Sequence, residues 1–415
     1  MMNQGNRIIF HIDVNNAFLS WEAVDRLKRG EELDLRTVPS VIGGDEESRH
    51  GIVLAKSMQA KKFNVTTGEP LYSARRKCNN LVVVPPRHHV YAKASKELMN
   101  MLKQYTPVFQ QYSIDECFLD FTNMERIYPD ILKLAYDIKD KVYSQFGFTV
   151  NVGIADNKLL AKMASDFTKP NKVHTLFSKE VKEKMWPLPI ERLFMVGKAT
   201  LLKFSKLNIH TIEDLANYDA DILEEKFHKY GIMIRQYANG IDDSPVVEEK
   251  PEDLKSISNS TTTSIDITNY NDGRLVIMSL AETVAARLRE SKYCCRLVAV
   301  TIKDSNFKKS SKQLKFLNPT DSTNDIIDIS CRLLKELWNG KPIRLLEVRV
   351  GSLCFERFNQ LSLLENNKVD EKNKNIDSAI DKIRKKFGNK SIFRAGFINT
   401  DISPMAGKDE QENKS

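Results

Sequence analysis

The spacing of hydrophobic residues predicts a chain of strands and helices in a recurring order. An apolar run over residues 8–14 is typical of a short buried strand, and apolar residues then recur at helical spacing until Gly30. A helix is expected around 90–105, and two further strands are expected at 108–112 and 117–121, joined by the acidic corner 113–116. A helix at 131–146, a strand at 149–155 and a helix at 157–167 follow. This order favours a split βαβ sheet of ferredoxin-like type.

The rest of the chain predicts an inserted segment and a second domain. A strand at 51–55 and a helical turn at 57–63 fall inside the first sheet's sequence, and two short helices follow about a turn at Gly197. Beyond a stretch rich in Pro and acidic residues, a second α+β domain is predicted. Its strands are expected at 256–267, 296–304, 312–317 and 343–354, and its helices at 271–289 and 325–338. The tail is polar with one helical patch at 378–388.

Charge and composition narrow the class of protein. The net charge is +8, and residues 286–316 alone hold nine basic and two acidic side chains, which favours a polyanionic partner. No apolar run approaches the roughly 20 residues of a membrane-spanning helix, so a cytoplasmic protein without a membrane partner is expected. The six cysteines form no CxxC pair, which argues against a zinc site or a disulfide framework.

Three carboxylates stand where elements of the first sheet end. Asp13 lies at the end of the first strand, and Asp115 and Glu116 lie at the hairpin corner. Two-metal phosphoryl transfer needs carboxylates that bridge two cations, and Mg²⁺ prefers such oxygen ligands. The carbonyl of Val14 could add another oxygen. The alternative is structural: Asp13 as a helix N-cap and the other two acids as a polar turn.

Three motifs carry a resemblance to a known family. The strings HIDVNNAFLSWE, YSIDECFLDF and VNVGIADNKLLAKMASDFTKPN, in this order and at this separation, closely resemble the Y-family translesion DNA polymerases of DinB/UmuC type. The resemblance continues to about residue 365. Three linked motifs are much more specific than any one of them.

The resemblance implies a multidomain α+β architecture. It consists of a ferredoxin-like palm with inserted fingers, a helical thumb that contains a helix-hairpin-helix element, and an α+β little finger. In this sequence the palm would comprise 1–18 and 86–175, the fingers 19–85, the thumb 176–245, a linker 246–256, the little finger 257–357 and the tail 358–415.

The resemblance also implies an active site. Asp13, Asp115 and Glu116 match the catalytic, metal-binding carboxylates, and the Val14 carbonyl matches a backbone ligand; two Mg²⁺ ions are expected, with Mn²⁺ as a possible substitute. Phe18 falls at the steric gate that excludes a 2'-hydroxyl, although it could instead pack in the core. Lys169 and Lys61 match groups that bind the incoming triphosphate. Lys61 replaces a common arginine and Met58 a common tyrosine, which weakens the expected contacts from the fingers.

DNA contacts are expected from the hairpin and the basic domain, and they would be independent of base sequence. The candidates are Gly197, Lys198, Arg287, Arg296, Lys303, Lys308, Lys309 and Lys315. A clamp-binding peptide of QLSLF type is implied by Gln360, Leu361, Ser362, Leu363 and Leu364. The structural alternatives are a plain helical turn, a solvated basic face and tail packing.

The function implied is low-fidelity translesion synthesis by a DNA-directed DNA polymerase. The primer 3'-hydroxyl would attack the α-phosphorus of a deoxynucleoside triphosphate and release pyrophosphate. The expected partners are primer-template DNA, deoxynucleotides and a sliding clamp, with the polymerase itself a monomer. Two alternatives stay open: a palm-type nucleotide cyclase, and a non-catalytic DNA-binding or clamp-binding accessory protein with a polymerase fold.

Overall fold

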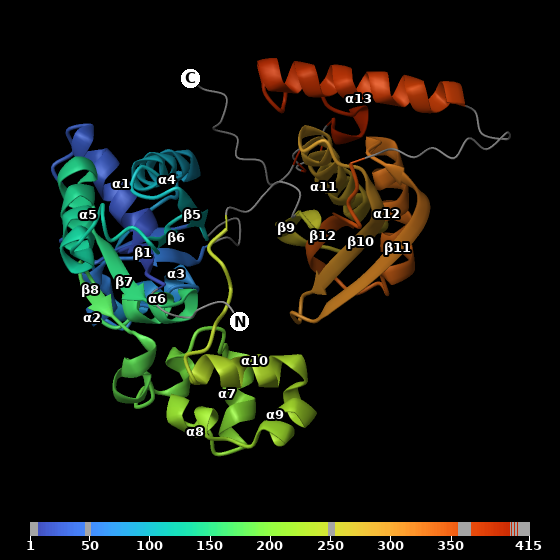
Figure 1. Cartoon of the computed structure of the whole chain (residues 1–415). Coiled ribbons are helices and arrows are strands. Elements are labelled where there is room, and N and C mark those ends of the chain that lie inside the picture. The colour runs from blue at the N-terminus through green and yellow to red at the C-terminus, as the bar shows by residue number, and fades with distance from the viewer. Residues whose placement is uncertain are drawn as a thin grey trace. The chain divides into compact units, whose positions relative to one another are not determined.

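The computed structural model describes residues 7–45, 51–247, 254–355, 367–398, 400, 402 and 405. The chain divides into two compact units, which are described separately. The first comprises Met1–Gly44 and Val53–Glu249, and the second comprises Asp45–Ile52 and Lys250–Ser415. The fold is a multidomain mixture of α and β structure, as the sequence predicted, and the described residues form three sheets (Figure 1).

A five-stranded sheet in the order β5-β6-β1-β7-β8 forms the centre of the first unit. Its strands are β1 (Ile9–Val14), β5 (Val108–Gln111), β6 (Glu116–Asp120), β7 (Val150–Ala155) and β8 (Val173–Thr175). Its helices are α1 (Ala17–Lys28), α4 (His88–Leu102), α5 (Ile131–Phe146) and α6 (Lys158–Ser165). All of these except β8 lie close to their predicted positions. The short β8 gives little sequence signal.

Different helices cover the two faces of this sheet, and the alternation of side chains along β1 shows which helices cover each face. Phe10, Ile12 and Val14 point into a core shared with α1, α4 and α5. Ile9 belongs to the other core, which contains α6. Because side chains alternate along a strand, Asp13 shares the α6 face with Ile9. The polar end of β1 therefore opens beneath α6.

The inserted segment folds on a small sheet of its own in the order β3-β2-β4. Its elements are β2 (Ser40–Gly43), β3 (Val53–Lys56), β4 (Val82–Val84), α2 (Met58–Lys62) and α3 (Leu71–Lys77). The sequence predicted β3 and α2 but not β2 or β4. These two strands are short, and their pairing is set by residues about forty positions apart.

Residues after β8 are helical, as predicted. The elements are the short turns η1 (Ser178–Glu180), η2 (Val181–Met185) and η3 (Ile190–Arg192), and the helices α7 (Lys198–Ser205), α8 (Ile212–Ala216), α9 (Ala220–Phe227) and α10 (Lys229–Ala238). Phe204, Ile212 and Ile234 bury their side chains in one core with residues of α6. The helical bundle is thus packed directly on the α6 face of the sheet.

The second unit has an antiparallel sheet in the order β11-β10-β12-β9. Its strands are β9 (Ser256–Ile267), β10 (Cys295–Asp304), β11 (Lys309–Thr320) and β12 (Ile343–Gly351), and its helices are α11 (Tyr270–Glu290), α12 (Thr323–Leu337) and α13 (Asn367–Phe387), with the turn η5 (Ala395–Phe397). Helices α11 and α12 pack on one face of the sheet, and their core includes Val298, Val300 and Val348.

Two elements of this unit are longer than predicted. Strand β11 exceeds the predicted 312–317 because its polar residues pair with β10 from Lys303↔Lys309 onward. Helix α13 begins before the predicted 378–388 patch and contacts α11, where Arg384 Nη2 lies 2.9 Å from Glu282 Oε2 (Figure 1). Pairing with β10, rather than local pattern, sets the length of β11, and ion pairs to α11 hold the second half of α13 in place. Among the described residues, no helix has the length and apolar composition needed to cross a membrane.

Candidate active site

Strand register brings Asp13 and Glu116 together. β1 and β6 are antiparallel, and Asp13 is the direct partner of Glu116. Directly opposed side chains lie on the same face of a sheet, so both carboxylates lie on the α6 face. The N-cap of α1 is Asn16, in a left-handed conformation, rather than Asp13. The helix-capping alternative for Asp13 is therefore wrong.

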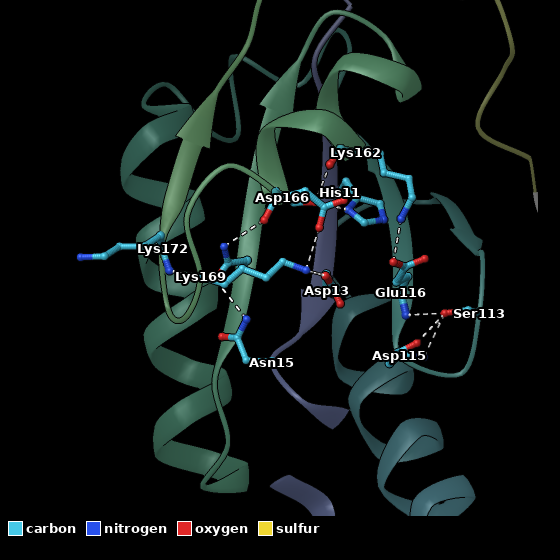
Figure 2. Close-up of polar contacts among 12 residues, drawn as sticks. His11, Asp13, Asn15, Ser113, Asp115, Glu116, Lys162, Asp166, Lys169 and Lys172 are labelled. Atoms are coloured by element: carbon cyan, nitrogen blue, oxygen red, sulfur yellow. Dashed lines mark hydrogen bonds and ion pairs between the residues drawn. The ribbon is translucent and has the colours of Figure 1, made fainter. Parts of the chain in front are cut away.

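Asp115 is held at the hairpin corner by Ser113. The Ser113 hydroxyl donates to Asp115 Oδ1 over 2.7 Å and accepts from the Glu116 N–H over 3.0 Å. The Val14 N–H donates to the Asp115 carbonyl over 3.1 Å, which ties the corner to the end of β1. The corner is also linked to α4, where Ser95 Oγ donates to the Ile114 carbonyl. The three carboxylates thus share one edge of the sheet (Figure 2).

The environment of Asp13 opposes its negative charge. The residue is 5% exposed, and burial raises the pKa of its side chain to about 6 despite an ion pair with Lys169. The Lys169 ammonium lies against Asp13 and also 2.8 Å from Asp166 (Figure 2). Burial works against the lysine's charge, but the two carboxylates hold the pKa of Lys169 above its usual value. The positive charge of Lys169 therefore does not offset the effect of burial on the pKa of Asp13.

The loop that carries Lys169 is fixed by two asparagines. Asn15 Oδ1 accepts from the Asn171 N–H over 2.9 Å, and Asn15 Nδ2 donates to Asn151 Oδ1 over 3.1 Å. Asn151 Nδ2 donates in turn to the Thr168 carbonyl over 2.7 Å. Lys169 lies between these anchor points. The predicted triphosphate lysine is therefore placed beside the carboxylates by side chains that the sequence analysis did not single out.

Glu116 has a cationic partner of its own. Lys162, on α6, donates from Nζ to Glu116 Oε1 over 2.7 Å. In the described part of the chain, no three acidic, histidine or cysteine side chains already converge as a metal-binding group. The carboxylates instead engage lysines, one at Asp13 and one at Glu116. Metal binding by Asp13, Val14, Asp115 and Glu116 stays a prediction.

Phe18 and Lys61 occupy different surroundings. Phe18 is half-buried on the first turn of α1, where its ring stacks on Tyr91 at a centroid distance of 4.8 Å. It thus packs partly in the core and partly at the surface, in the same β1–α1 connection as Asp13. Lys61 is exposed on α2, in the inserted segment. Its predicted role in triphosphate binding is untested.

The basic residues predicted to contact DNA do not all share one surface. Lys303 and Lys309 are direct partners, and Lys315 pairs with Leu297; all three alternate with the core-facing Val298 and Val300. They therefore lie on the open face of the sheet, away from α11 and α12. Arg349 is exposed on β12 with the same parity, and the sequence analysis missed it.

Other predicted DNA contacts lie elsewhere. Arg287 is on α11, on the helical side, and Arg296 lies at an irregularity in the β10–β11 pairing. Lys308 is exposed in the turn before β11. In the first unit, Gly197 is the N-cap of α7 and is followed by the exposed Lys198, with nothing within 4 Å of the position of a Cβ on Gly197. The predicted clamp-binding peptide at 360–364 lies outside the described residues.

Known proteins resemble this chain over nearly its whole length. Models described as the impB/mucB/samB family and its C-terminal domain match residues 12–166 and 254–363. DNA polymerase IV of Clostridium acetobutylicum is 48% identical over 390 residues, which cover 94% of this chain and 98% of that protein. DNA polymerase IV 1 of Bacillus subtilis is 32% identical over 405 residues, which cover 97% and 96%.

A solved structure shares the fold. A Y-family DNA polymerase chimera superposes with a TM-score of 0.73 at 22% sequence identity, covering 84% of this chain and all of that one. These comparisons favour a polymerase over the cyclase and accessory-protein alternatives. The chain belongs to the impB/mucB/samB family, that of the Y-family translesion DNA polymerases, as its three motifs predicted.

Proposed function

We propose that Asp13, Asp115 and Glu116 carry the nucleotidyl transfer of this translesion DNA polymerase. The observation that supports the proposal most directly is the pairing of Asp13 with Glu116 across β1 and β6, with Asp115 next in sequence at the same edge. Three carboxylates at one edge can serve two cations, whereas a helix cap or a polar turn would need only one of them. The products are a primer extended by one deoxynucleotide and pyrophosphate.

The donor set fits two divalent cations, Mg²⁺ or Mn²⁺. Carboxylate and carbonyl oxygens are the hard ligands that Mg²⁺ prefers. The raised pKa of Asp13, about 6, and the lysines paired with Asp13 and Glu116 indicate a site that attracts positive charge. Asp13, Asp115, Glu116 and the Val14 carbonyl would hold the ions. When bound, such ions neutralise charge on the phosphates and lower the pKa of the attacking hydroxyl.

Neighbouring side chains orient the nucleotide. Lys169, fixed beside Asp13, supplies a positive charge to the triphosphate of the incoming deoxynucleotide, and Lys61 adds a second contact from α2. Phe18, backed by Tyr91, presents an aromatic ring that excludes a 2'-hydroxyl. Substitution Phe18→Ala is therefore expected to raise ribonucleotide incorporation. An unchanged preference for deoxynucleotides would remove this role from Phe18.

DNA is held by phosphate contacts outside the carboxylate site. Lys303, Lys309 and Lys315 on the open face of the second sheet bind the duplex backbone, with Lys308, Arg287 and Arg296 as further contacts. In the first unit, backbone N–H groups at Gly197 and Lys198 bind another phosphate. The sequence at 360–364 binds a sliding clamp, so its deletion removes clamp stimulation only. We also infer that the protein is a monomer and that it acts in the cytoplasm.

Primer extension tests the assignment of the carboxylates. The purified chain is incubated with Mg²⁺, each deoxynucleotide and primer-template, either undamaged or with an abasic site. The variant Asp115→Ala, Glu116→Ala is compared in parallel, and its DNA affinity is measured by fluorescence anisotropy. We expect the variant to lose extension by a factor of about 10³ or more, because several ligands are lost together. Its DNA affinity should stay near that of the unaltered chain.

Each alternative result has a distinct meaning. Extension by the variant at the unaltered rate would show that other groups carry the reaction. Equal losses of extension and DNA binding would assign the carboxylates to the structure of the DNA-binding surface. Bypass of the abasic site by the unaltered chain would demonstrate translesion synthesis directly.

A further inference from the structure

We propose that Lys162 is a positioning residue for Glu116. The ammonium donates to Glu116 Oε1 over 2.7 Å, and both side chains are largely buried. Within the described residues, Lys162 is the only side chain that pairs with this carboxylate, and it engages one of the two oxygens. Oε2 is then available to a cation in a single orientation of the carboxylate. The proposal rests on the catalytic role assigned to Glu116 above.

The backbone of α6 is fixed closely against the sheet. A Cβ on Gly153 of β7 would lie 2.0 Å from the Ala161 carbonyl oxygen and 2.5 Å from the Ser165 nitrogen. Only glycine permits this approach of helix to strand. The helix residues that contact Gly153 are thus immediately next to Lys162 and one turn beyond it. The base of the Lys162 side chain therefore has little freedom to shift.

A hydrogen-bonded chain ties α6 to the strand that carries Asp13. The Ser165 hydroxyl donates to the Lys162 carbonyl over 2.8 Å, and His11 Nδ1 lies 2.8 Å from the same hydroxyl. Because that hydroxyl has one proton, His11 is the donor to it. These hydrogen bonds fix the position of Lys162 relative to β1, in addition to its pair with Glu116 on β6.

Two aromatic rings confine the other end of the lysine. Lys162 Nζ lies 5.7 Å from the ring centroid of Tyr112 and 5.4 Å from that of Phe194. Ring faces attract a desolvated ammonium but accept no conventional hydrogen bond as strong as that of a carboxylate. The ammonium is therefore directed to Glu116, and Glu116 is directed by it (Figure 2).

Lys162 orients Glu116, which favours the reaction, but its positive charge opposes cation binding. These two effects can be measured separately, so the proposal is testable. A positive charge beside Glu116 repels a divalent cation, so the lysine does not increase cation affinity. Its contribution is to the orientation of the carboxylate, and misplacement of a reacting group by about 1 Å can reduce a rate 100-fold. Loss of the ammonium should lower the rate of insertion without weakening cation binding. A structural role alone would predict no such separation.

The test compares Lys162→Met with Lys162→Arg and with Lys158→Met. Lys158 is a matched control one turn earlier on α6: its ammonium also lies over an aromatic ring, that of Phe118 at 5.1 Å, but its hydrogen bond over 2.7 Å goes to the Gln110 amide oxygen. Single-turnover insertion gives the maximal rate and the apparent nucleotide dissociation constant. Mn²⁺ affinity is measured separately by electron paramagnetic resonance, on a complex with a dideoxy-terminated primer that cannot react.

We expect Lys162→Met to lower the maximal insertion rate about 10- to 100-fold. Its Mn²⁺ dissociation constant should be equal to or smaller than that of the unaltered chain. Lys162→Arg should recover part of the rate, since a guanidinium can also pair with the carboxylate. Lys158→Met should match the unaltered chain in both measurements. Melting temperatures of all variants, recorded in parallel, exclude general unfolding.

Two results would overturn the proposal. One is an insertion rate in Lys162→Met within about 2-fold of the rate in Lys158→Met. The other is a weakening of Mn²⁺ binding in proportion to the loss of rate, which would mean that Lys162 maintains the metal ligands rather than orienting one of them. A wrong catalytic assignment of Glu116 would give a different result. In that case the variant Asp115→Ala, Glu116→Ala, which keeps Lys162, would still extend primers.

Discussion

Two charge clusters, one in each unit and each with a buried carboxylate, are balanced in different ways. In the first unit, the described residues supply two paired lysines at the edge shared by Asp13, Asp115 and Glu116, and burial raises the pKa of Asp13 to about 6. In the second unit, Glu282 is 3% exposed and pairs with two arginines, Arg384 at 2.9 Å and Arg394 at 2.7 Å. Asp13 and Glu282 are both buried, but only the cluster around Asp13 lacks compensating charge.

The difference separates charges that do chemistry from charges that hold a fold. A buried carboxylate that is fully paired has a stable partner and no need of a ligand, as at Glu282. A buried carboxylate with a raised pKa is destabilising unless a cation arrives, which is a common property of active sites. The ion pair also explains why α13 packs on α11, because Arg384 lies on α13 and its partner Glu282 lies on α11.

The largest effect is expected when the balanced cluster is broken. Arg384→Met, Arg394→Met leaves Glu282 with neither of its two cations in a buried site, and a buried charge left without a partner costs about 3 to 5 kcal/mol. Thermal unfolding should show a lower melting temperature for the second unit. The maximal rate of nucleotide insertion below that temperature should be nearly unchanged.

Replacement of the whole cluster is the matched control. A variant with Glu282, Arg384 and Arg394 all replaced by Met should recover most of the lost stability, since apolar groups of similar volume can substitute for a buried ion pair. If this variant were as unstable as Arg384→Met, Arg394→Met, packing and not charge balance would explain the cluster.

An effect of opposite sign is expected when charge is removed from the unbalanced site. The folded pKa of Asp13 is about 6, above an unfolded value of roughly 4, so ionisation destabilises the fold as pH rises through this range. Asp13→Asn should abolish primer extension yet raise the free energy of unfolding at pH 7.5, without divalent cations, by up to about 3 kcal/mol. The gain should disappear as the pH falls toward 4.

Asp166→Asn is the control for this gain. Asp166 also pairs with Lys169 but its side chain is 46% exposed, so its neutralisation should not stabilise the protein. Equal stabilisation by the two substitutions would indicate a general reduction of negative charge rather than relief at Asp13.

The smallest effect concerns basic groups on two sides of the second unit. Replacement of Lys303, Lys309 and Lys315 by Ala should lower the slope of log affinity against log salt for primer-template binding by about 3, roughly one for each phosphate contact. Lys382, Lys385 and Lys386 are exposed on α13, beyond the helical layer, and serve as the control. Similar changes in both variants would place DNA on the tail helix as well as on the sheet.

The sequence predicted the parts of the site that depend on local pattern. Asp13 at a strand end and Asp115 at a hairpin corner follow from the hydrophobic pattern, and the Asp13–Glu116 pairing follows from the expected sheet. The helix 131–146 has the predicted bounds, because its apolar spacing and its terminal Gly147 are strong signals.

The missed residues depend on contacts between distant segments. Lys162 looks like an ordinary helix lysine until α6 is placed over β6, and Asn15 and Asn151 gain meaning only when β1 and β7 are paired. The packing of α13 on α11 likewise depends on ion pairs such as that of Arg289 with Asp381, 92 residues apart. The periodicity of hydrophobic residues does not indicate which distant segments will contact one another.

The most direct test of the central claim is a crystal structure of the full chain with primer-template, a non-reactive primer end, an incoming deoxynucleotide and Mn²⁺. The unbalanced carboxylates should bind the cation, so anomalous difference peaks are expected at bonding distance from Asp13, Asp115 and Glu116, with the Lys169 ammonium moved from Asp13 toward the triphosphate. Anomalous peaks bound only to other residues, with Lys169 still paired to Asp13, would contradict the account.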